Sequence, residues 1–202
     1  MPFVVRLAGS GDAAAVAMIY TPAVIGRAIS FELEPPDAAE MARRIAATLP
    51  ALPWLVAEHA GQVVGYAYAG RHRERAAYAW SVDVSVYVHE SAHRAGVGRG
   101  LYTALFGILV LQGYRTAFAG ATLPNPASVG LHRAMGFRPV GVYEGVGYKL
   151  GRWHDVAWFR LPLAPLDRDP PAPLGVDRVE GRRGFTAALA AGAACMKEGG
   201  RS

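Results

Sequence analysis

The fold of this chain is decided by the stretch Val82-Asp83-Val84-Ser85-Val86-Tyr87-Val88-His89-Glu90-Ser91-Ala92-His93-Arg94-Ala95-Gly96-Val97-Gly98-Arg99-Gly100-Leu101. Its first part places valine at every second position, which is the period of a β-strand. A short polar turn and three alternating glycines follow, and the apolar run Leu101 to Leu111 then predicts a buried helix. Glycines let the backbone approach a phosphate, and the first N–H groups of a helix are available to an anion. The stretch therefore predicts an anion-binding loop between a strand and a helix.

Three kinds of nucleotide site use such a loop. A P-loop ends in Gly-Lys-Ser/Thr, which Arg99-Gly100 does not supply. A dinucleotide-binding turn needs an acidic residue on the next strand, and Tyr114 to Thr122 contains none. The third kind is the diphosphate site of an acyl-CoA transferase.

Two motifs resemble that third kind. The segment His93-Arg94-Ala95-Gly96-Val97-Gly98 resembles the loop Gln/Arg-x-x-Gly-x-Gly/Ala of the GNAT superfamily of N-acetyltransferases, with histidine replacing the first residue. The segment from Asn125 to Phe137, which ends in Gly-Phe, resembles the second signature of that superfamily. The resemblance implies acetyl-CoA as co-substrate and the GNAT fold, a mixed central sheet flanked by helices.

The composition is that of one globular domain. The chain has 202 residues, of which 52% are hydrophobic and 18% charged, and its formal net charge is +5. Its arginines are scattered, so we expect no nucleic-acid partner; a modest positive field suits a polyanionic cofactor. A single cysteine, Cys195, allows no internal disulfide and favours a reducing compartment. The N-terminus lacks a signal pattern and no run is long enough to span a bilayer, so we expect a cytoplasmic protein without membrane partners.

The periodicity predicts strands alternating with helices, in an α/β arrangement. Predicted strands cover Val4–Leu7, Trp54–Glu58, Val63–Ala69, the central strand, Thr116–Ala121, Arg138–Leu150 and Asp155–Leu161. Predicted helices cover Ala13–Tyr20 with Asp12 as N-cap, a segment from Asp37 through Thr48, Leu101–Leu111, and a short helix that ends at Gly136. The domain would span residues 1–163. Clustered prolines and an Ala/Gly-rich segment then predict a linker and a weakly ordered tail over residues 164–202.

A closer resemblance covers about residues 3 to 163. It rests on Tyr78 to Val88, Phe31-Glu32, Trp54 to Glu58, Gly65 to Ala69 and Gly151 to Val156, which together resemble phosphinothricin N-acetyltransferases and their methionine sulfoximine-acetylating relatives. The resemblance implies a cytoplasmic homodimer that serves detoxification.

The resemblance also implies two catalytic residues. Asp83 takes the position of a glutamate proposed as general base in that family, although an aspartate is one methylene shorter and would need a bridging water; alternatively, it caps or pairs with an arginine. His132 takes the position of an acid that protonates the CoA sulfur, as histidine can near neutral pH; alternatively, it only hydrogen-bonds within its helix.

Further residues are assigned to the two substrates by the same analogy. Acetyl-CoA would be bound by Val86, Val88, His93, Arg94, Gly96, Val97, Gly98, Arg99, Gly100, Asn125 and Ser128, of which Asn125 and Ser128 also suit a helix start. Arg73 and Arg75 would grip an acceptor carboxylate, unless they belong to a solvated basic loop. Phe31, Glu32 and Tyr87 would line the acceptor pocket. No metal is expected: Trp153-His154-Asp155 suggests a metal site or a triad, but neighbouring strand residues point to opposite faces.

The sequence thus predicts an acetyl-CoA-dependent N-acetyltransferase that acts on the α-amino group of a small amino acid or mimic, by direct transfer. Two alternatives remain open at this point. The acceptor is another amine or a protein N-terminus, or the chain is a non-catalytic acyl-CoA-binding module in which Asp83 is idle.

Overall fold

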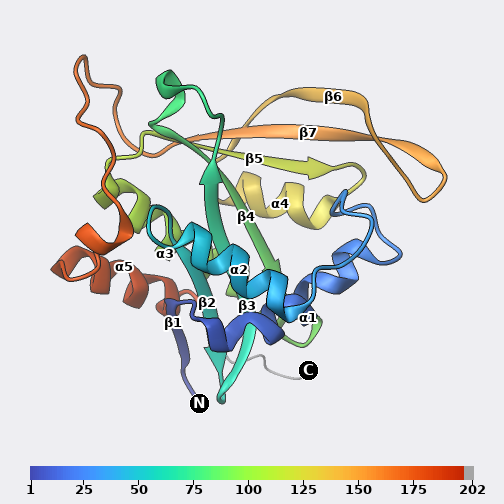
Figure 1. The fold of residues 1–202 in the computed structure, drawn as a ribbon, viewed down its shortest axis with the longest axis horizontal. Helices are drawn as coiled ribbons and strands as arrows, with labels where there is room; N and C mark the ends of the chain where they lie inside the picture. The colour runs from blue at the N-terminus through green and yellow to red at the C-terminus, as the bar shows by residue number, and fades with distance from the viewer. Residues whose placement is uncertain (198–202) are drawn as a thin grey trace.

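The computed structural model describes residues 1–197 and shows one mixed sheet with helices on both faces (Figure 1). The strands are β1 (Phe3–Leu7), β2 (Trp54–His59), β3 (Gln62–Arg71), β4 (Ser81–Val88), β5 (Thr116–Thr122), β6 (Arg138–Lys149) and β7 (Arg152–Pro162). The helices are α1 (Ala13–Val24), α2 (Ala38–Thr48), α3 (Val97–Gln112), α4 (Pro126–Ala134) and α5 (Arg183–Ala194), with short turns η1 (Ser10–Asp12), η2 (Ala76–Tyr78), η3 (Glu90–Ala92) and η4 (Val176–Arg178). This confirms the predicted α/β class.

The sheet opens between β4 and β5. Its order is β1-β2-β3-β4-β5-β7-β6, and all neighbours are antiparallel except β4 and β5. Those two pair only between Ser81–Asp83 and Thr116–Phe118. Beyond this point β4 runs downward in Figure 1 and β5 to the right. The rest of the β4 edge therefore has main-chain groups without a strand partner on the β5 side.

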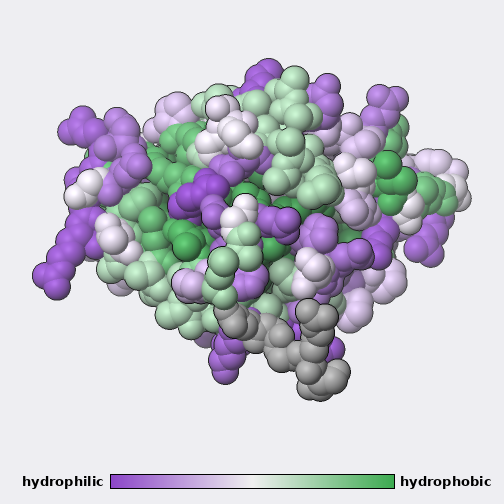
Figure 2. Space-filling view, turned by 90° about the horizontal axis from the view of Figure 1, so that it is seen from below, coloured by the Kyte–Doolittle hydropathy of each residue, from purple (hydrophilic) through white to green (hydrophobic). Residues whose placement is uncertain are grey.

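Two separate cores lie on the two faces of the sheet. Helices α1 and α2 pack on Trp54, Val56 and Tyr66, whereas α3 packs on the opposite face with Val82 and Val84 of β4. Because side chains alternate along a strand, Asp83 and Tyr87 share the α1–α2 face. In Figure 2 hydrophobic residues reach the surface in the middle of the face seen from below, among hydrophilic ones.

Most predicted elements are present, with shifted ends. Asp37 caps α2 by accepting from the N–H of Glu40 at 2.8 Å, as expected of an N-cap. Asp12 does not cap α1: its carboxylate accepts from Arg6 and from the N–H of Gly9. Helix α3 begins at Val97, before the predicted Leu101, so two of the three glycines lie in its first turns.

The prediction of a weakly ordered tail over residues 164–202 is corrected for residues 164–197, and residues 198–202 lie outside the described part of the chain. Beyond residue 163 the chain crosses the α3 face, where Val176, Val179, Phe185 and Met196 are at most 8% exposed and belong to the larger core. Helix α5 lies against α3. The Ala/Gly composition has a packing reason, because small side chains let two helix backbones approach closely. A Cβ atom added to Gly192 would lie 2.6 Å from the carbonyl oxygen of Gly100.

Candidate active site

The loop between β4 and α3 has the backbone of an anion-binding turn. Arg94 and Gly96 both have positive φ, 66° and 80°, and they turn the chain from η3 into α3. The first helical bond runs from the N–H of Gly100 to the carbonyl of Gly96 at 2.9 Å. The N–H groups of Val97, Gly98 and Arg99 therefore precede the helical ladder and are available to an anion. Arg94 and Arg99 are exposed beside them and add positive charge.

The three glycines of the loop face different parts of the structure. A Cβ on Gly98 would lie 3.2 Å from Leu131 of α4 and 3.8 Å from Val88 of β4, so this glycine faces the opening of the sheet. A Cβ on Gly96 or Gly100 would instead meet the backbone of Cys195 or Gly192. Gly96 and Gly100 thus make room for α5, and the expectation that their missing side chains make room for a diphosphate is corrected.

One loop histidine is used within the protein. The ring of His93 donates from Nε2 to the carbonyl oxygen of Val88 at 3.1 Å. This bond ties the turn to the end of β4 and occupies a carbonyl that we expected to be open to the cofactor. Of the two backbone groups of Val88, the N–H therefore remains available to acetyl-CoA.

Helix α4 forms the other side of the opening. Asn125 accepts from the N–H of Ser128 at 3.1 Å, so it caps the helix. His132 is 3% exposed; its Nε2 lies 3.2 Å from the hydroxyl of Tyr102 and its Nδ1 3.4 Å from the hydroxyl of Ser128. Burial lowers the pKa of His132 to about 4. Burial therefore favours the uncharged ring, and the role of His132 as the acid that protonates the CoA sulfur stays a prediction.

Asp83 lies where β4 and β5 separate. It is the last residue of β4 that pairs with β5, opposite Phe118, and its Oδ1 is 2.7 Å from Nδ1 of His72. Burial raises the pKa of Asp83, and the hydrogen bond with His72 opposes this effect. The sequence analysis missed His72 as a partner; its place one residue beyond β3, opposite a β4 carboxylate, was the available signal.

Three features match one family: the space between the unpaired β4 edge and α4, which we call the groove, the anion-binding turn, and the carboxylate of Asp83 at the point where β4 and β5 separate. The model of the acetyltransferase (GNAT) domain matches residues 5–158. The chain belongs to the GNAT acetyltransferases.

Relatives of this GNAT chain are similar along most of their length. It is 39% identical to a phosphinothricin N-acetyltransferase of Streptomyces viridochromogenes over 81% of this chain and 92% of the relative. It is 34% identical to an L-methionine sulfoximine/L-methionine sulfone acetyltransferase of Salmonella typhimurium, over 79% and 94%. The crystal structure of a phosphinothricin acetyltransferase from Sinorhizobium meliloti in complex with acetyl-CoA matches with a TM-score of 0.80 at 34% identity, over 85% of this chain and 94% of that one.

The fit of acetyl-CoA to this GNAT chain rests on its own backbone. The pantetheine arm needs an unpaired strand edge, and β4 has one beyond Asp83. The diphosphate needs free N–H groups at a helix start, and α3 provides them behind a positive-φ turn. The chain therefore fits the cofactor.

A cavity of approximately 210 Å³ lies on the α1–α2 face of the sheet. It is lined by Tyr20, Met41, Arg44, Thr48, Trp54, Tyr66 and Tyr68. Drug-sized ligands need about 300–1,000 Å³, so this volume suits a smaller molecule. Tyr87 contacts two of these lining residues: it stacks on Tyr66 at 5.2 Å and meets Tyr20 edge-on at 5.0 Å.

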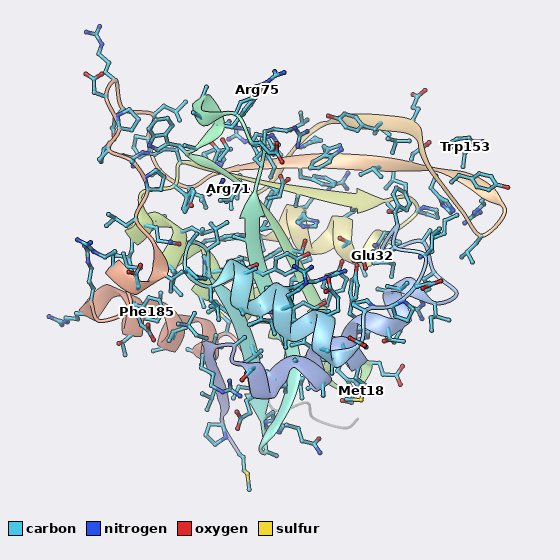
Figure 3. The ribbon with its side chains drawn as sticks, viewed as in Figure 1. Met18, Glu32, Arg71, Arg75, Trp153 and Phe185 are labelled. Atoms are coloured by element: carbon cyan, nitrogen blue, oxygen red, sulfur yellow. The ribbon has the colours of Figure 1, made fainter. Side chains whose placement is uncertain are left out.

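Of the predicted pocket residues, Glu32 is bonded to the wall of this cavity, whereas Phe31 packs on the β6–β7 hairpin. Glu32 accepts from Arg44 at 2.8 and 3.0 Å and from the hydroxyl of Tyr20 at 2.8 Å. Arg44 holds the pKa of Glu32 below its ordinary value. The ring of Phe31 packs on Gly147 of β6, and 38% of the residue is exposed. Figure 3 shows Glu32 between α1 and α2.

A lysine that the sequence analysis passed over fixes the segment that carries Phe31 and Glu32. The ammonium of Lys149 is buried and donates at 2.7 Å to the carbonyls of Val24, Ser30 and Glu32. One ammonium thus holds three backbone carbonyls in place. Through these bonds Lys149 joins the β6–β7 hairpin to the segment that carries Phe31 and Glu32.

The two loop arginines do not line the cavity. Arg73 and Arg75 are exposed, and Figure 3 shows Arg75 pointing away from Glu32 at the top of the molecule. Arg73 nevertheless lies close enough to Asp83 to lower its pKa. The loop therefore brings positive charge to the carboxylate at the apex of the opening.

The segment Trp153-His154-Asp155 is structural. His154 is buried, with its Nε2 2.9 Å from the carbonyl of Lys149, and Asp155 accepts from the N–H of Gly145. Residues 1–197 contain no group of three His, Cys, Asp or Glu side chains placed to hold a metal ion. No helix in the same range has the length and apolarity to cross a membrane.

Proposed function

We propose that this GNAT acetyltransferase transfers the acetyl group of acetyl-CoA to the α-amino group of a small amino acid or amino-acid mimic. Phosphinothricin and methionine sulfoximine are the best-matched acceptors, because relatives that resemble the chain along nearly their whole length are named for them. The observation that carries the proposal is the place of Asp83, a half-buried carboxylate at the point where β4 and β5 separate.

The cofactor side of the proposal uses the groove. Acetyl-CoA supplies the acetyl group as an activated thioester. The α3 N–H groups and the exposed Arg94 and Arg99 bind the diphosphate, and free backbone groups of Val86 and Val88 hold the pantetheine arm. Asn125 and Ser128 border this arm. His132, as a neutral ring bonded to Ser128 and Tyr102, keeps α4 beside the groove.

The acceptor side uses the α1–α2 face. The amine lies at Asp83. It must lose a proton before it can attack, and Asp83 belongs to the group that accepts this proton. Its α-carboxylate, two bonds away, is bound by Arg73 and Arg75, since arginine binds carboxylates through paired hydrogen bonds. The acceptor side chain enters the cavity, where Tyr87, Glu32 and Phe31 shape the walls.

We further propose that the protein is a homodimer through the β6–β7 hairpin. β6 is the outer strand of the sheet, and it exposes Val140, Val142, Tyr143, Val146 and Tyr148 by 49% to 60%. Trp153, at the outer end of the hairpin in Figure 3, is 67% exposed. A continuous apolar edge of this kind favours a protein partner. Light scattering on Val142→Asp and wild type measures the mass, and a monomeric wild type contradicts the dimer.

We place this activity in the cytoplasm and in detoxification, without a nucleic-acid partner. The placement is supported by the single cysteine and by the acceptors of the relatives.

A thiol-release assay with acetyl-CoA tests the proposed function. The panel holds phosphinothricin, methionine sulfoximine, free amino acids, their amides, simple amines and a peptide with a free N-terminus. Turnover with the first three groups supports the proposal. Turnover only with peptides or simple amines moves the acceptor class, and acetyl-CoA binding without any turnover makes the chain a binding module.

A further inference from the structure

We propose that His72 is a second catalytic residue and that its imidazole, held by Asp83, is the group that takes the proton from the acceptor amine. The inference rests on the proposed function, whose acceptor amine lies at Asp83. It starts from the 2.7 Å distance between Nδ1 of His72 and Oδ1 of Asp83.

The ring of His72 is fixed on three sides. It stacks on Phe118 with centroids 4.3 Å apart and planes 15° from parallel, and Tyr78 meets it edge-on at 5.8 Å. Asp83 holds the third side through Nδ1. A catalytic ring held in one orientation by packing and a hydrogen bond loses little freedom on binding its substrate.

The pair stands at the apex of the opening. Asp83 lies across from Gly70 on β3 and from Phe118 on β5, and that pairing is the last one before β4 and β5 separate. Because His72 stacks on Phe118, its ring lies over the same apex. The unpaired edge of β4, along which we place the thioester, begins at this point, and the side chain of Asp83 lies on the face opposite Val82 and Val84.

The second ring nitrogen of His72 is available. Within residues 1–197, no protein atom makes a hydrogen bond with Nε2, and the atom is not among the buried polar atoms that lack a partner. Only 12% of the side chain is exposed. Nε2 therefore reaches solvent from a largely enclosed ring, as a proton acceptor for a bound ligand must.

Asp83 and His72 suit different roles in the proton transfer. A carboxylate bonded to Nδ1–H fixes the tautomer whose Nε2 carries the lone pair, and it stabilises the imidazolium that forms. An imidazole is also better matched than a carboxylate to proton transfer near neutral pH. Asp83 thus orients and stabilises, and His72 accepts.

The proton balance of the step is as follows. The acceptor ammonium gives one proton to Nε2 of His72, and the neutral amine then attacks the thioester carbonyl. The N–C bond forms, the C–S bond breaks, and the second amine proton ends on the departing thiol. His72 afterwards returns its proton to water.

The other titratable groups around the pair do not replace it. Arg73 is cationic, Tyr68 of β3 and Tyr78 of η2 are phenols, and burial raises the pKa of Tyr68. None of these groups can accept a proton from an ammonium near neutral pH.

The test compares His72→Gln with wild type in steady-state kinetics. Glutamine keeps a donor for Asp83 but takes up no proton. We expect kcat/KM for the acceptor to fall about 10²-fold or more, the dissociation constant of acetyl-CoA to stay within about twofold, and the acidic limb of the pH profile, which belongs to the pair, to disappear. His59→Gln is the matched control, because His59 also stacks on a phenylalanine, Phe3, at 4.4 Å, and lies at the far end of β2.

Imidazole NMR gives a readout that does not depend on turnover. We expect Nδ1 of His72 to carry the proton in wild type, and we expect this single tautomer to be lost in Asp83→Asn, where the carboxylate that accepts from Nδ1 is gone. His72→Gln with near wild-type kcat/KM and an unchanged acidic limb would overturn the proposal and leave Asp83 as the base. If wild type itself turns over no amino acid, the proposed function has failed, and the NMR result still decides whether the pair exists.

Discussion

The carbonyl oxygen of Cys195 lies 2.5 Å from the position that a Cβ atom on Gly96 would take. The end of α5 thus fills the space behind the anion-binding turn. The N–H of Lys197 also donates to the carbonyl of Ala95 at 2.9 Å. The C-terminal segment and the turn that we assign to the diphosphate therefore support each other.

This contact predicts that the segment beyond residue 163 is needed for stability. A chain that ends after Pro165 loses the burial of Val176, Val179 and Phe185, each worth about 1.5–3 kcal/mol. The sum is comparable with the stability of a domain, about 5–15 kcal/mol. We expect the truncated chain to aggregate or to unfold at a lower urea concentration than wild type. A truncated chain with the urea midpoint of wild type would contradict the packing assigned to this segment.

A single methyl group tests the same packing in the full chain. Gly192→Ala puts a Cβ 2.6 Å from the carbonyl oxygen of Gly100, and overpacking of this kind costs about 1–3 kcal/mol. Gly181→Ala is the control, since a Cβ there meets nothing within 4 Å. Equal unfolding midpoints for the two variants would show that α5 does not press on α3.

The sequence allowed the centre of the molecule to be predicted better than its periphery. The period of Val82 to Val88 and the glycine-rich start of the next helix are local signals. The strand lies where it was expected, and the helix begins four residues earlier than predicted, at Val97. The tail was misread because an Ala/Gly-rich helix has the same composition whether it is loose or closely packed. His72 was missed because its partner is eleven residues away, and only the β3–β4 pairing brings the two together.

Gly98 is the glycine that faces the groove, so its substitution should weaken acetyl-CoA binding. Valine at this position would enter the space between Val88 and Leu131, where the cofactor must approach. We expect the dissociation constant measured by calorimetry to rise at least about tenfold, which is about 1.4 kcal/mol. Gly130→Ala in α4, where a Cβ meets nothing within 4 Å, should bind normally. Unchanged affinity in Gly98→Val would refute the groove assignment.

The buried ring of His132 predicts an acid-sensitive contribution to stability. Burial lowers the pKa of His132 to about 4, below the ordinary value of about 6.5. The fold favours the neutral ring, so this contribution is full above about pH 6.5 and is lost as the pH falls toward 4. The loss is about 3 kcal/mol on this shift. The free energy of unfolding should fall less steeply over this range in His132→Phe than in wild type, and His132 titrating near pH 6.5 by NMR would contradict the prediction.

The loop arginines decide whether an acceptor carboxylate is recognised. If Arg73 and Arg75 bind it beside Asp83, Arg75→Ala should raise the acceptor KM strongly and leave the acetyl-CoA KM nearly unchanged, because the lost contact is made only to the acceptor. Arg75→Lys should restore part of the effect, since lysine cannot form the planar paired contact. Arg75→Ala should also erase the preference for a free amino acid over its amide, whereas Arg182→Ala, an exposed arginine before α5, should not. Steady-state kinetics with both acceptors measures this preference. A wild-type enzyme that uses the amide as well as the acid would show that no carboxylate is read, and the acceptor would then be a peptide or a simple amine.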